Sequence, residues 1–531
     1  MAIKRYFADA DNTITNAFKS DLTTRGTGAN MGAADVLEIF SIYGQASGTT
    51  EQLSSELSRA LIKFPVSDIQ TDRSSSVIPR SGSVSFYLKL FNAKHTSTVP
   101  RDMVIMAHAL TRSWQEGTGL DMEEYTDLTH GGAGSTWTFG GLTGSWQNKG
   151  GDFVEIGDGG TLNKNMFKTT FNDGIEDMEV DVTPLVEMWA NDVGNVLGTL
   201  ENYGFILKLT GTQEAFNEST TTTATPNPSG AVESFFTKKF FSRSSEFFFK
   251  RPVIEARWDS ADKDDRGNFF YSSSLAPAED NLNTLFLYNY VRGQLRNIPE
   301  IGTTGSIMVS LFSGNVDDTA PSGSALQLSI GGGVTIAAST HATGGFYETG
   351  IYTCSVALTA AATPVETLYD VWSTGSIVDG NHLRTQFFTG SIDATKYFAS
   401  DNNPNKTHVI ALDNLKSIYS TKETARFRLY VREKDWNPTI YTRATTQIEN
   451  KIIESASYKI FRISDELEVI PYGTGSDNHT QLSFDVSGNY FDLDMSLLEA
   501  GHGYGLKFVF YNGAIGSYVE QSDTFKFRVE D

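Results

Sequence analysis

Arg426-Phe427-Arg428-Leu429-Tyr430-Val431-Arg432 is the stretch that decides the fold class. Its apolar residues Phe427, Leu429 and Val431 alternate with polar or charged neighbours. A period of two places alternate side chains on opposite faces of a β-strand. The stretch therefore predicts a strand whose apolar side chains are buried together. We expect its arginines to be exposed or to lie in an interface.

The same period of two recurs along the chain. Residues 83–90 place every second side chain on one apolar face, and Phe525, Phe527 and Val529 alternate with charged residues. The 35 Phe and 21 Tyr suit half-buried strands, and the 48 Gly suit tight turns. These observations predict a chain built mainly of β-strands.

Helical periodicity is scarce and concentrates in two segments. Residues 182–190 are amphipathic, and Pro184 falls where a first helical turn accepts proline. The second segment, residues 279–296, has apolar residues at helix-compatible spacings: Leu282, Leu285, Leu287 and Val291. We expect a short helix in each segment.

Breaks in these patterns suggest the domain boundaries. A charged stretch at 260–267 follows a predicted strand at 252–258, and another break at 413–423 precedes the arginine-rich strand. We expect an all-β chain in which a jelly-roll-like β-sandwich precedes two immunoglobulin- or fibronectin-like β-sandwiches. The expected parts are residues 1–258 (jelly roll), 259–300 (a connecting segment with a short helix), 301–417 and 418–531 (the two smaller sandwiches).

Composition and charge narrow the function classes. The formal net charge of −22 repels phosphate backbones, so we expect no nucleic-acid partner. Cys354 is the one cysteine, and an internal disulfide is therefore excluded. The first residues lack the apolar run of a secretory signal, and no run approaches the roughly 18 residues of a membrane span. We expect a protein made in the cytoplasm, without membrane insertion.

An ordered set of short stretches runs through the N-terminal half. The set comprises Arg59–Phe64, Ser83–Leu90, Trp114–Gly119, Thr136–Trp137, Trp146, Gly150–Phe153, Val180–Val186, Trp189, Asn202–Leu207, Phe241–Arg243 and Arg251–Glu255. Together and in this order they resemble the DNRLRE, or disaggregatase-related, jelly-roll family. The resemblance implies a jelly roll on a surface-associated protein, and some members bind acidic polysaccharide such as alginate. It implies no conserved catalytic centre.

Tryptophans in this half have two possible roles. Trp114, Trp137, Trp146 and Trp189 could stack on sugar rings. Tryptophans in a sandwich more often fill the core, with the indole N–H hydrogen-bonded at its edge. We retain Trp114, Trp137 and Trp146 as candidate glycan contacts or loop anchors.

One loop of the N-terminal half is acidic. Its carboxylates are Glu116, Asp121, Glu123, Glu124 and Asp127. Hard cations such as calcium take several oxygen ligands, but this loop shows no ordered ligand spacing. Residues 262–267 faintly imitate a calcium loop, but Arg266 occupies a ligand position, and we do not assign an EF-hand. We expect no cofactor, with a bound cation left open.

Two tyrosines have the sequence context of a tyrosine corner, in which the hydroxyl folds back to upstream backbone. Residues 498–504 read L-x-x-G-x-x-Y and end in Tyr504. Tyr352 lies two residues before Cys354, as in immunoglobulin domains. Both patterns resemble immunoglobulin-like and fibronectin-type sandwiches, and Cys354 is expected to be a small buried apolar residue.

Residues 289–295 and 488–494 read Asn-Tyr-Val-Arg-Gly-Gln-Leu and Gly-Asn-Tyr-Phe-Asp-Leu-Asp. In these phrases, the connecting segment and the C-terminal domain are similar to virion structural proteins of large marine tailed bacteriophages. The resemblance implies other virion proteins and copies of the chain itself as partners, and the virion as its location.

Three functions remain open. The sequence lacks the phosphate-binding loop, zinc-protease and serine-hydrolase motifs, and its eight His show no metal-ligand spacing on a helix. We expect a non-enzymatic virion structural protein of the tail, neck, baseplate or capsid surface, with a role in attachment to host-surface polysaccharide. A bacterial carbohydrate-binding adhesin is the first alternative, although it would need export. A polysaccharide-degrading enzyme is the second, because paired carboxylates need not be close in sequence.

Overall fold

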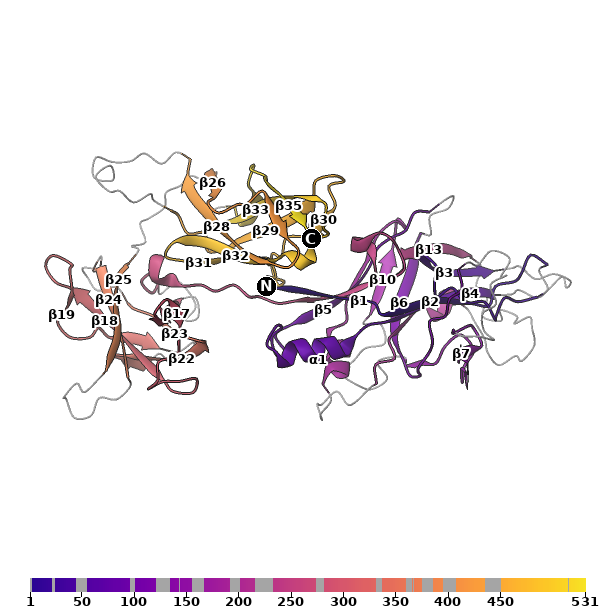
Figure 1. Cartoon of the computed structure of the whole chain (residues 1–531), viewed down its shortest axis with the longest axis horizontal. Helices are drawn as coiled ribbons and strands as arrows, with labels where there is room; N and C mark the ends of the chain where they lie inside the picture. The colour runs from indigo at the N-terminus through magenta and orange to yellow at the C-terminus, as the bar shows by residue number, and fades with distance from the viewer. Residues whose placement is uncertain are drawn as a thin grey trace. The chain divides into compact units, whose positions relative to one another are not determined.

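The computed structural model describes most of the chain, and all structural statements concern these residues. They are 2–21, 24–43, 55–95, 101–120, 134–142, 144–154, 167–191, 201–214, 233–273, 281–330, 337–359, 365, 367–374, 385–394, 407–434, 450–513 and 515–531. They divide into two compact units, Met1–Asp259 and Ser260–Asp531 (Figure 1). None of the described helices is long and apolar enough to cross a membrane.

The first unit is a two-sheet β-structure with short helices. Its elements are β1 (Ile3–Phe7), β2 (Ala10–Thr15), β3 (Val36–Tyr43), β4 (Ser55–Lys63), α1 (Val66–Ser74), β5 (Ser85–Leu90), β6 (Met103–Leu110), β7 (Phe139–Gly141), β8 (Gly144–Ser145), β9 (Phe153–Val154), β10 (Lys168–Phe171), β11 (Met178–Asp181), α2 (Thr183–Ala190), β12 (Phe205–Leu209), α3 (Gly211–Glu214), β13 (Phe235–Phe241), η2 (Phe248–Lys250) and β14 (Val253–Arg257). The helix predicted at 182–190 is confirmed as α2.

The strand order of this unit is that of a jelly roll. One sheet runs β1-β14-β5-β11, and the other contains the run β10-β6-β12-β4-β3-β13. Late strands therefore lie between early ones: β14 separates β1 from β5, and β12 separates β4 from β6. Such interleaving follows when a long antiparallel hairpin wraps into two facing sheets. The predicted jelly-roll-like sandwich is confirmed.

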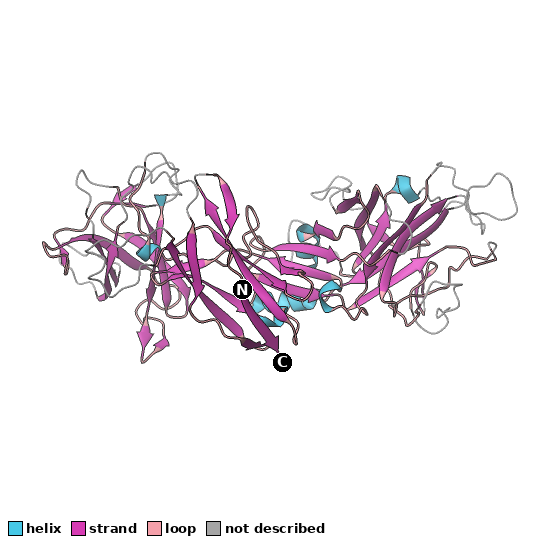
Figure 2. Ribbon diagram, turned by 90° about the horizontal axis from the view of Figure 1, so that it is seen from above, coloured by secondary structure: helices cyan, strands magenta, loops and turns pink. Residues whose placement is uncertain are grey.

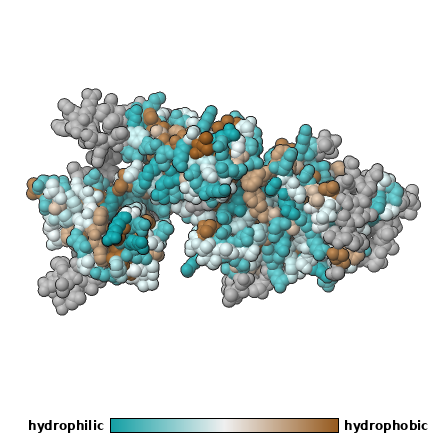
Figure 3. Space-filling view, in the orientation of Figure 1, coloured by the Kyte–Doolittle hydropathy of each residue, from teal (hydrophilic) through white to brown (hydrophobic). Residues whose placement is uncertain are grey.

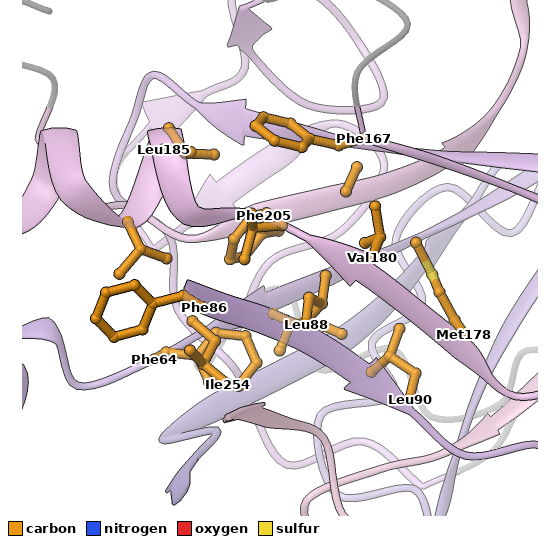
Figure 4. Packing of buried hydrophobic residues seen from close by; sticks show 14 of the residues in the cluster. Phe64, Phe86, Leu88, Leu90, Phe167, Met178, Val180, Leu185, Phe205 and Ile254 are labelled. Atoms are coloured by element: carbon orange, nitrogen blue, oxygen red, sulfur yellow. The ribbon is translucent and has the colours of Figure 1, made fainter. Parts of the chain in front are cut away.

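The core lies between the two sheets (Figure 4). Phe86 and Leu88 point inward from β5, and Phe205 from β12 meets them from the other sheet. The alternation predicted at 83–90 is confirmed, because every second residue from Val84 to Leu90 is buried. Burial of this apolar surface is the main stabilising contribution to the unit.

The second unit contains two further sandwiches (Figure 2). Its elements are η3 (Asp265–Gly267), β15 (Asn283–Tyr288), β16 (Tyr290–Val291), β17 (Gln294–Leu295), β18 (Ile307–Gly314), β19 (Pro321–Ser322), β20 (Leu328–Ile330), β21 (Ala337–Ser339), β22 (Ala342–Glu348), β23 (Ile351–Val356), β24 (Thr367–Thr374), β25 (Gln386–Asp393), β26 (His408–Leu412), β27 (Ile418–Ser420), β28 (Thr424–Glu433), β29 (Ala456–Arg462), β30 (Glu468–Ile470), β31 (Ser483–Asp485), β32 (Gly488–Asp494), η6 (Met495–Leu497), β33 (Gly503–Asn512), β34 (Ser517–Glu520) and β35 (Phe525–Glu530).

A single strand, β22, joins the two sheets of the middle sandwich. Residues 342–344 pair with β18, and residues 345–348 pair with β23. The β15-β23 and β18-β24-β25 ladders therefore share β22 and enclose one core that contains Leu285, Tyr352 and Trp372.

The helix predicted over 279–296 is wrong. Residues 283–288 form β15, which pairs with β23, and residues 290–295 form the hairpin β16-β17. Arg292 and Gly293 both have positive φ, 53° and 78°, as a tight two-residue turn with the hairpin's own twist requires. The segment 259–300 thus contributes a strand to the middle sandwich and is more than a connection.

The C-terminal sandwich has the strand order of an immunoglobulin domain. One sheet runs β26-β28-β32-β31, and the other runs β27-β35-β33-β29-β30, with β27 parallel to β35. The predicted start of this sandwich is residue 418. Because β26 (from His408) pairs with β28, the sandwich begins earlier than predicted. The all-β chain of three sandwiches is confirmed.

The strand at 426–432 behaves as predicted. Phe427, Leu429 and Val431 are buried together in the C-terminal sandwich. On the other face, Arg426 forms two 2.8 Å hydrogen bonds with Asp492, and Arg428 pairs with Asp485. The face of the molecule in Figure 3 is largely hydrophilic, as expected for a net charge of −22.

The segment at 262–268 contacts both sandwiches of the second unit. The backbone of Asp262 and Asp264 pairs with Phe484 of β31. Arg266 reaches into the middle sandwich, where its guanidinium lies 2.7 and 2.5 Å from the two carboxylate oxygens of Asp370. Asp370 is fully buried, and this ion pair therefore fixes the segment on the middle sandwich.

Candidate functional site

The first unit contains an open cavity of about 470 Å³. It lies where α1 begins, where α2 ends and where the chain enters β12. Its lining residues are Asp9, Lys63, Phe64, Pro65, Val66, Ser67, Gln70, Met188, Trp189, Asn191, Glu201, Asn202 and Tyr203. The volume falls within the roughly 300–1,000 Å³ of small-molecule sites.

The two helices that form the walls are fixed to the core and to each other. Pro184 stands in the first turn of α2, and Leu185 and Val186 are buried beneath it. Arg73 of α1 forms an ion pair with Glu187 of α2, and both side chains are largely buried. This pair holds the walls together on the side away from solvent.

Trp189 supplies the aromatic part of the lining. Its side chain is 5% exposed and packs edge-on against Phe205, with ring centroids 4.9 Å apart. The indole Nε1 is buried and has no hydrogen-bond partner. A buried N–H without an acceptor is costly, and buried indoles usually have one.

The turn before β12 positions the polar rim. Asn202 donates from Nδ2 to the carbonyl oxygen of Phe64 at 2.9 Å and accepts from the backbone of Gly204 at 3.1 Å. Gly204 has φ of +90°, and a Cβ there would lie 2.3 Å from the carbonyl oxygen of Ile62. Only glycine therefore suits this turn, which places Glu201 and Tyr203 at the cavity.

Three charged groups of the described residues line the cavity. Asp9 and Glu201 are exposed carboxylates, and Lys63 is half-buried. Partial desolvation raises the pKa of Asp9, although the Lys63 charge opposes the rise. Tyr203 donates its hydroxyl to Glu201, and this hydrogen bond raises the pKa of Tyr203. With both carboxylates ionised, the described part of the lining carries one net negative charge.

The tryptophans predicted as glycan contacts or loop anchors lie in a second apolar cluster. Trp137 and Trp146 are buried at 2% and 4% exposure, and half-buried Trp114 packs against them. Trp146 donates to the carbonyl oxygen of Thr136, and Trp114 donates to that of Tyr203, both at 2.8 Å. Trp114 thereby fixes the backbone of Tyr203, which lines the cavity.

The two predicted tyrosine corners differ. The Tyr504 hydroxyl bonds to the backbone of Glu499, next to Leu498, as a corner requires. The Tyr352 hydroxyl accepts from the backbone of Ile298 at 2.9 Å and donates to Gly302 at 3.0 Å. Tyr352 therefore anchors a loop about fifty residues upstream and forms no local corner. Cys354 is buried.

No cation site forms among the described residues. They contain no cluster of three or more His, Cys, Asp or Glu able to hold a metal ion. Glu116 pairs with Arg243 at 2.5 and 2.8 Å, and the acidic residues 121–127 lie outside the described ranges. In the stretch 262–267, Asp264 caps η3 and Asp265 accepts from the backbone of Thr284.

A comparison of the chain with models of known protein families and with curated proteins finds no match. The cavity must therefore be interpreted from its own chemistry. It presents hydrogen-bonding groups of both kinds around an indole, from segments spread over residues 9–203. Sequence reasoning missed this assembly. The one sequence signal for it is Trp189, whose pattern predicts either a core residue or a sugar contact.

Proposed function

We propose that this chain is a non-enzymatic structural protein of a bacteriophage virion, in the tail, neck, baseplate or capsid surface. We further propose that its jelly roll contributes to attachment to a host-surface glycan. The observation that carries the proposal is a chain of three β-sandwiches, one of which holds a cavity lined by polar and aromatic side chains.

Two features support a role in an assembly. The hairpin β16-β17, within the stretch similar to virion proteins, exposes Tyr290 and Val291 at 61% and 50%. The β33-β34 hairpin of the C-terminal sandwich exposes Tyr511, Ile515 and Val519. Contiguous exposed apolar patches mark contacts with other proteins, and these two hairpins are where we propose such contacts. Stable contacts in symmetric particles bury more than about 1,000 Å².

The cavity supports the attachment role. Sugar-binding sites combine an aromatic ring with hydrogen-bond donors and acceptors for the hydroxyl groups. Half-buried Tyr203 provides a ring, buried Trp189 forms part of the apolar wall, and Gln70, Asn191 and Asn202 provide amide groups. These groups would hold a sugar through hydrogen bonds and ring contacts. No covalent reaction of the ligand is needed, which agrees with a non-enzymatic attachment protein.

Particle association tests the proposal. The protein should be found by mass spectrometry in purified phage particles, at constant stoichiometry to the major capsid protein through density-gradient purification. Absence from particles would overturn the virion role, and presence on the bacterial surface would support an adhesin in its place. Turnover of any polysaccharide by the purified full-length chain would overturn the non-enzymatic assignment.

A further inference from the structure

We infer that the cavity of the first unit binds a neutral, hydroxyl-rich sugar and discriminates against uronate-containing polysaccharide. This inference rests on the proposed attachment function and names its ligand class. It departs from the acidic polysaccharide implied by the family resemblance, because the charges that line the cavity have the wrong sign for a polyanion.

The electrostatic argument depends on three side chains. Among the described residues, Lys63 is the one cation that lines the cavity, against the two carboxylates of Asp9 and Glu201. A uronate entering this space would bring a further negative charge to the partly desolvated carboxyl of Asp9. Like charges in such surroundings repel more strongly than in water. A neutral sugar avoids that cost.

Hydrogen bonding favours the neutral ligand as well. Carboxylates only accept hydrogen bonds, and sugar hydroxyls can donate to them. Asp9 and Glu201 therefore suit hydroxyl donors, while amide groups such as Asn191 can donate in return. A uronate carboxylate only accepts hydrogen bonds, so it could use the donors of the lining, such as Lys63 and Asn191, but could donate nothing to the carboxylates of Asp9 and Glu201.

The test measures binding of the full-length chain to defined polysaccharides by affinity electrophoresis and calorimetry. Dextran and mannan are the neutral probes, and alginate and polygalacturonate are the uronate probes. We expect at least one neutral probe to bind, with an affinity that changes less than about twofold between 50 and 500 mM salt. We expect neither uronate probe to bind.

Variants on the rim connect binding to this cavity. Ser67 is exposed, so Ser67→Trp should fill the mouth without affecting the core and should lower the affinity for the neutral probe by about tenfold or more. Glu201→Gln should lower it by about tenfold, since hydrogen bonds to a charged acceptor are the stronger ones. Asp173→Asn, an exposed carboxylate outside the cavity, is the matched control and should leave the affinity unchanged.

Charge reversal tests the sign of the discrimination. Glu201→Lys changes the net charge of the lining from −1 to +1 and should create measurable alginate binding that weakens with salt. Alginate binding by the wild-type chain at the neutral-probe affinity or tighter would overturn the inference but leave a glycan role. Binding of none of the four probes would overturn it too, while particle association would still decide the virion role.

Discussion

The hydroxyl of Tyr504 donates a hydrogen bond to the carbonyl oxygen of Glu499 at 2.7 Å, five residues upstream in the chain. Tyr504 is fully buried on β33, and its ring lies 5.9 Å from that of Phe527 on the neighbouring strand. The bond therefore fixes the chain where it enters the inner strand of the C-terminal sandwich.

Tyr504→Phe should remove this bond and keep the ring packing. One such hydrogen bond contributes about 1 kcal/mol to the free energy of unfolding. We expect the free energy of unfolding to fall by that amount in urea denaturation, followed by far-ultraviolet circular dichroism. Tyr511→Phe, which changes an exposed hydroxyl in the same strand, should change the free energy by less than about 0.5 kcal/mol.

The buried ion pair between Arg59 and Glu214 should be sensitive to loss of one partner. Two hydrogen bonds of 3.0 and 2.7 Å join them, and Lys208 lies 3.1 Å from the same carboxylate. Glu214→Gln would leave two buried cations without their counter-ion, which costs about 3–5 kcal/mol of unfolding free energy. Denaturant unfolding of the first unit measures this, and Glu201→Gln on the surface is the control.

The same pair predicts a pH dependence. Burial alone would raise the pKa of Glu214, but the charges of Arg59 and Lys208 lower it below its ordinary value. A depressed folded-state pKa contributes stability above the unfolded pKa of about 4.3 and loses it as the pH falls through the folded value. The stability difference between wild type and Glu214→Gln should therefore shrink in acid below pH 4.

Asp11 should show the opposite dependence. Its carboxylate is 1% exposed, one oxygen has no partner, and burial raises its pKa to about 7. A raised folded-state pKa means that stability is fully present below the unfolded pKa of about 3.9 and is lost as the pH rises through 7. Asp11→Asn, which mimics the protonated form, should match wild type near pH 4 and exceed its melting temperature at pH 8. Equal melting temperatures at pH 8 would contradict this.

Arg266 should hold its segment on the middle sandwich. Arg266→Met leaves the buried carboxylate of Asp370 without its cation, although the indole N–H of Trp372 still donates to it at 2.6 Å. We expect a loss of about 3 kcal/mol or more and faster tryptic cleavage near residue 263. Adding Asp370→Asn removes the unpaired charge and should restore part of the loss. A double variant no more stable than the single one would argue against the ion pair.

Sequence reasoning succeeded where one local pattern determines the structure. At 426–432 and 83–90 the period of two allows only one face of the strand to be buried. A register shift by one residue would expose Phe427 or Phe86. Residues 281–296 had no such constraint. Leu282 and Leu285 have a helical spacing, Leu285 and Leu287 alternate as in a strand, and the pairing of β15 with β23 selects the strand.

The cavity could not be predicted because its residues become neighbours only through tertiary structure. Asp9, Gln70 and Glu201 are far apart in sequence and meet where β1, α1 and β12 lie at one end of the sandwich. Tryptophan roles were likewise undecided, because a buried and a sugar-stacking indole share the same local sequence. The unpartnered N–H of Trp189 is visible only in the structure.

The pairing of Ile3 with Arg257 has a kinetic consequence. Strand β1 can pair with its sheet neighbour β14 only after about 250 further residues have been synthesised. Strand β14 also lies between β1 and β5 in the sheet. The four-stranded sheet therefore cannot close on the ribosome until the end of the first unit emerges from the exit tunnel. Contacts this distant in sequence slow folding, and until β14 is made β1 lacks its neighbour in this sheet and one edge of β5 stays open to chaperones.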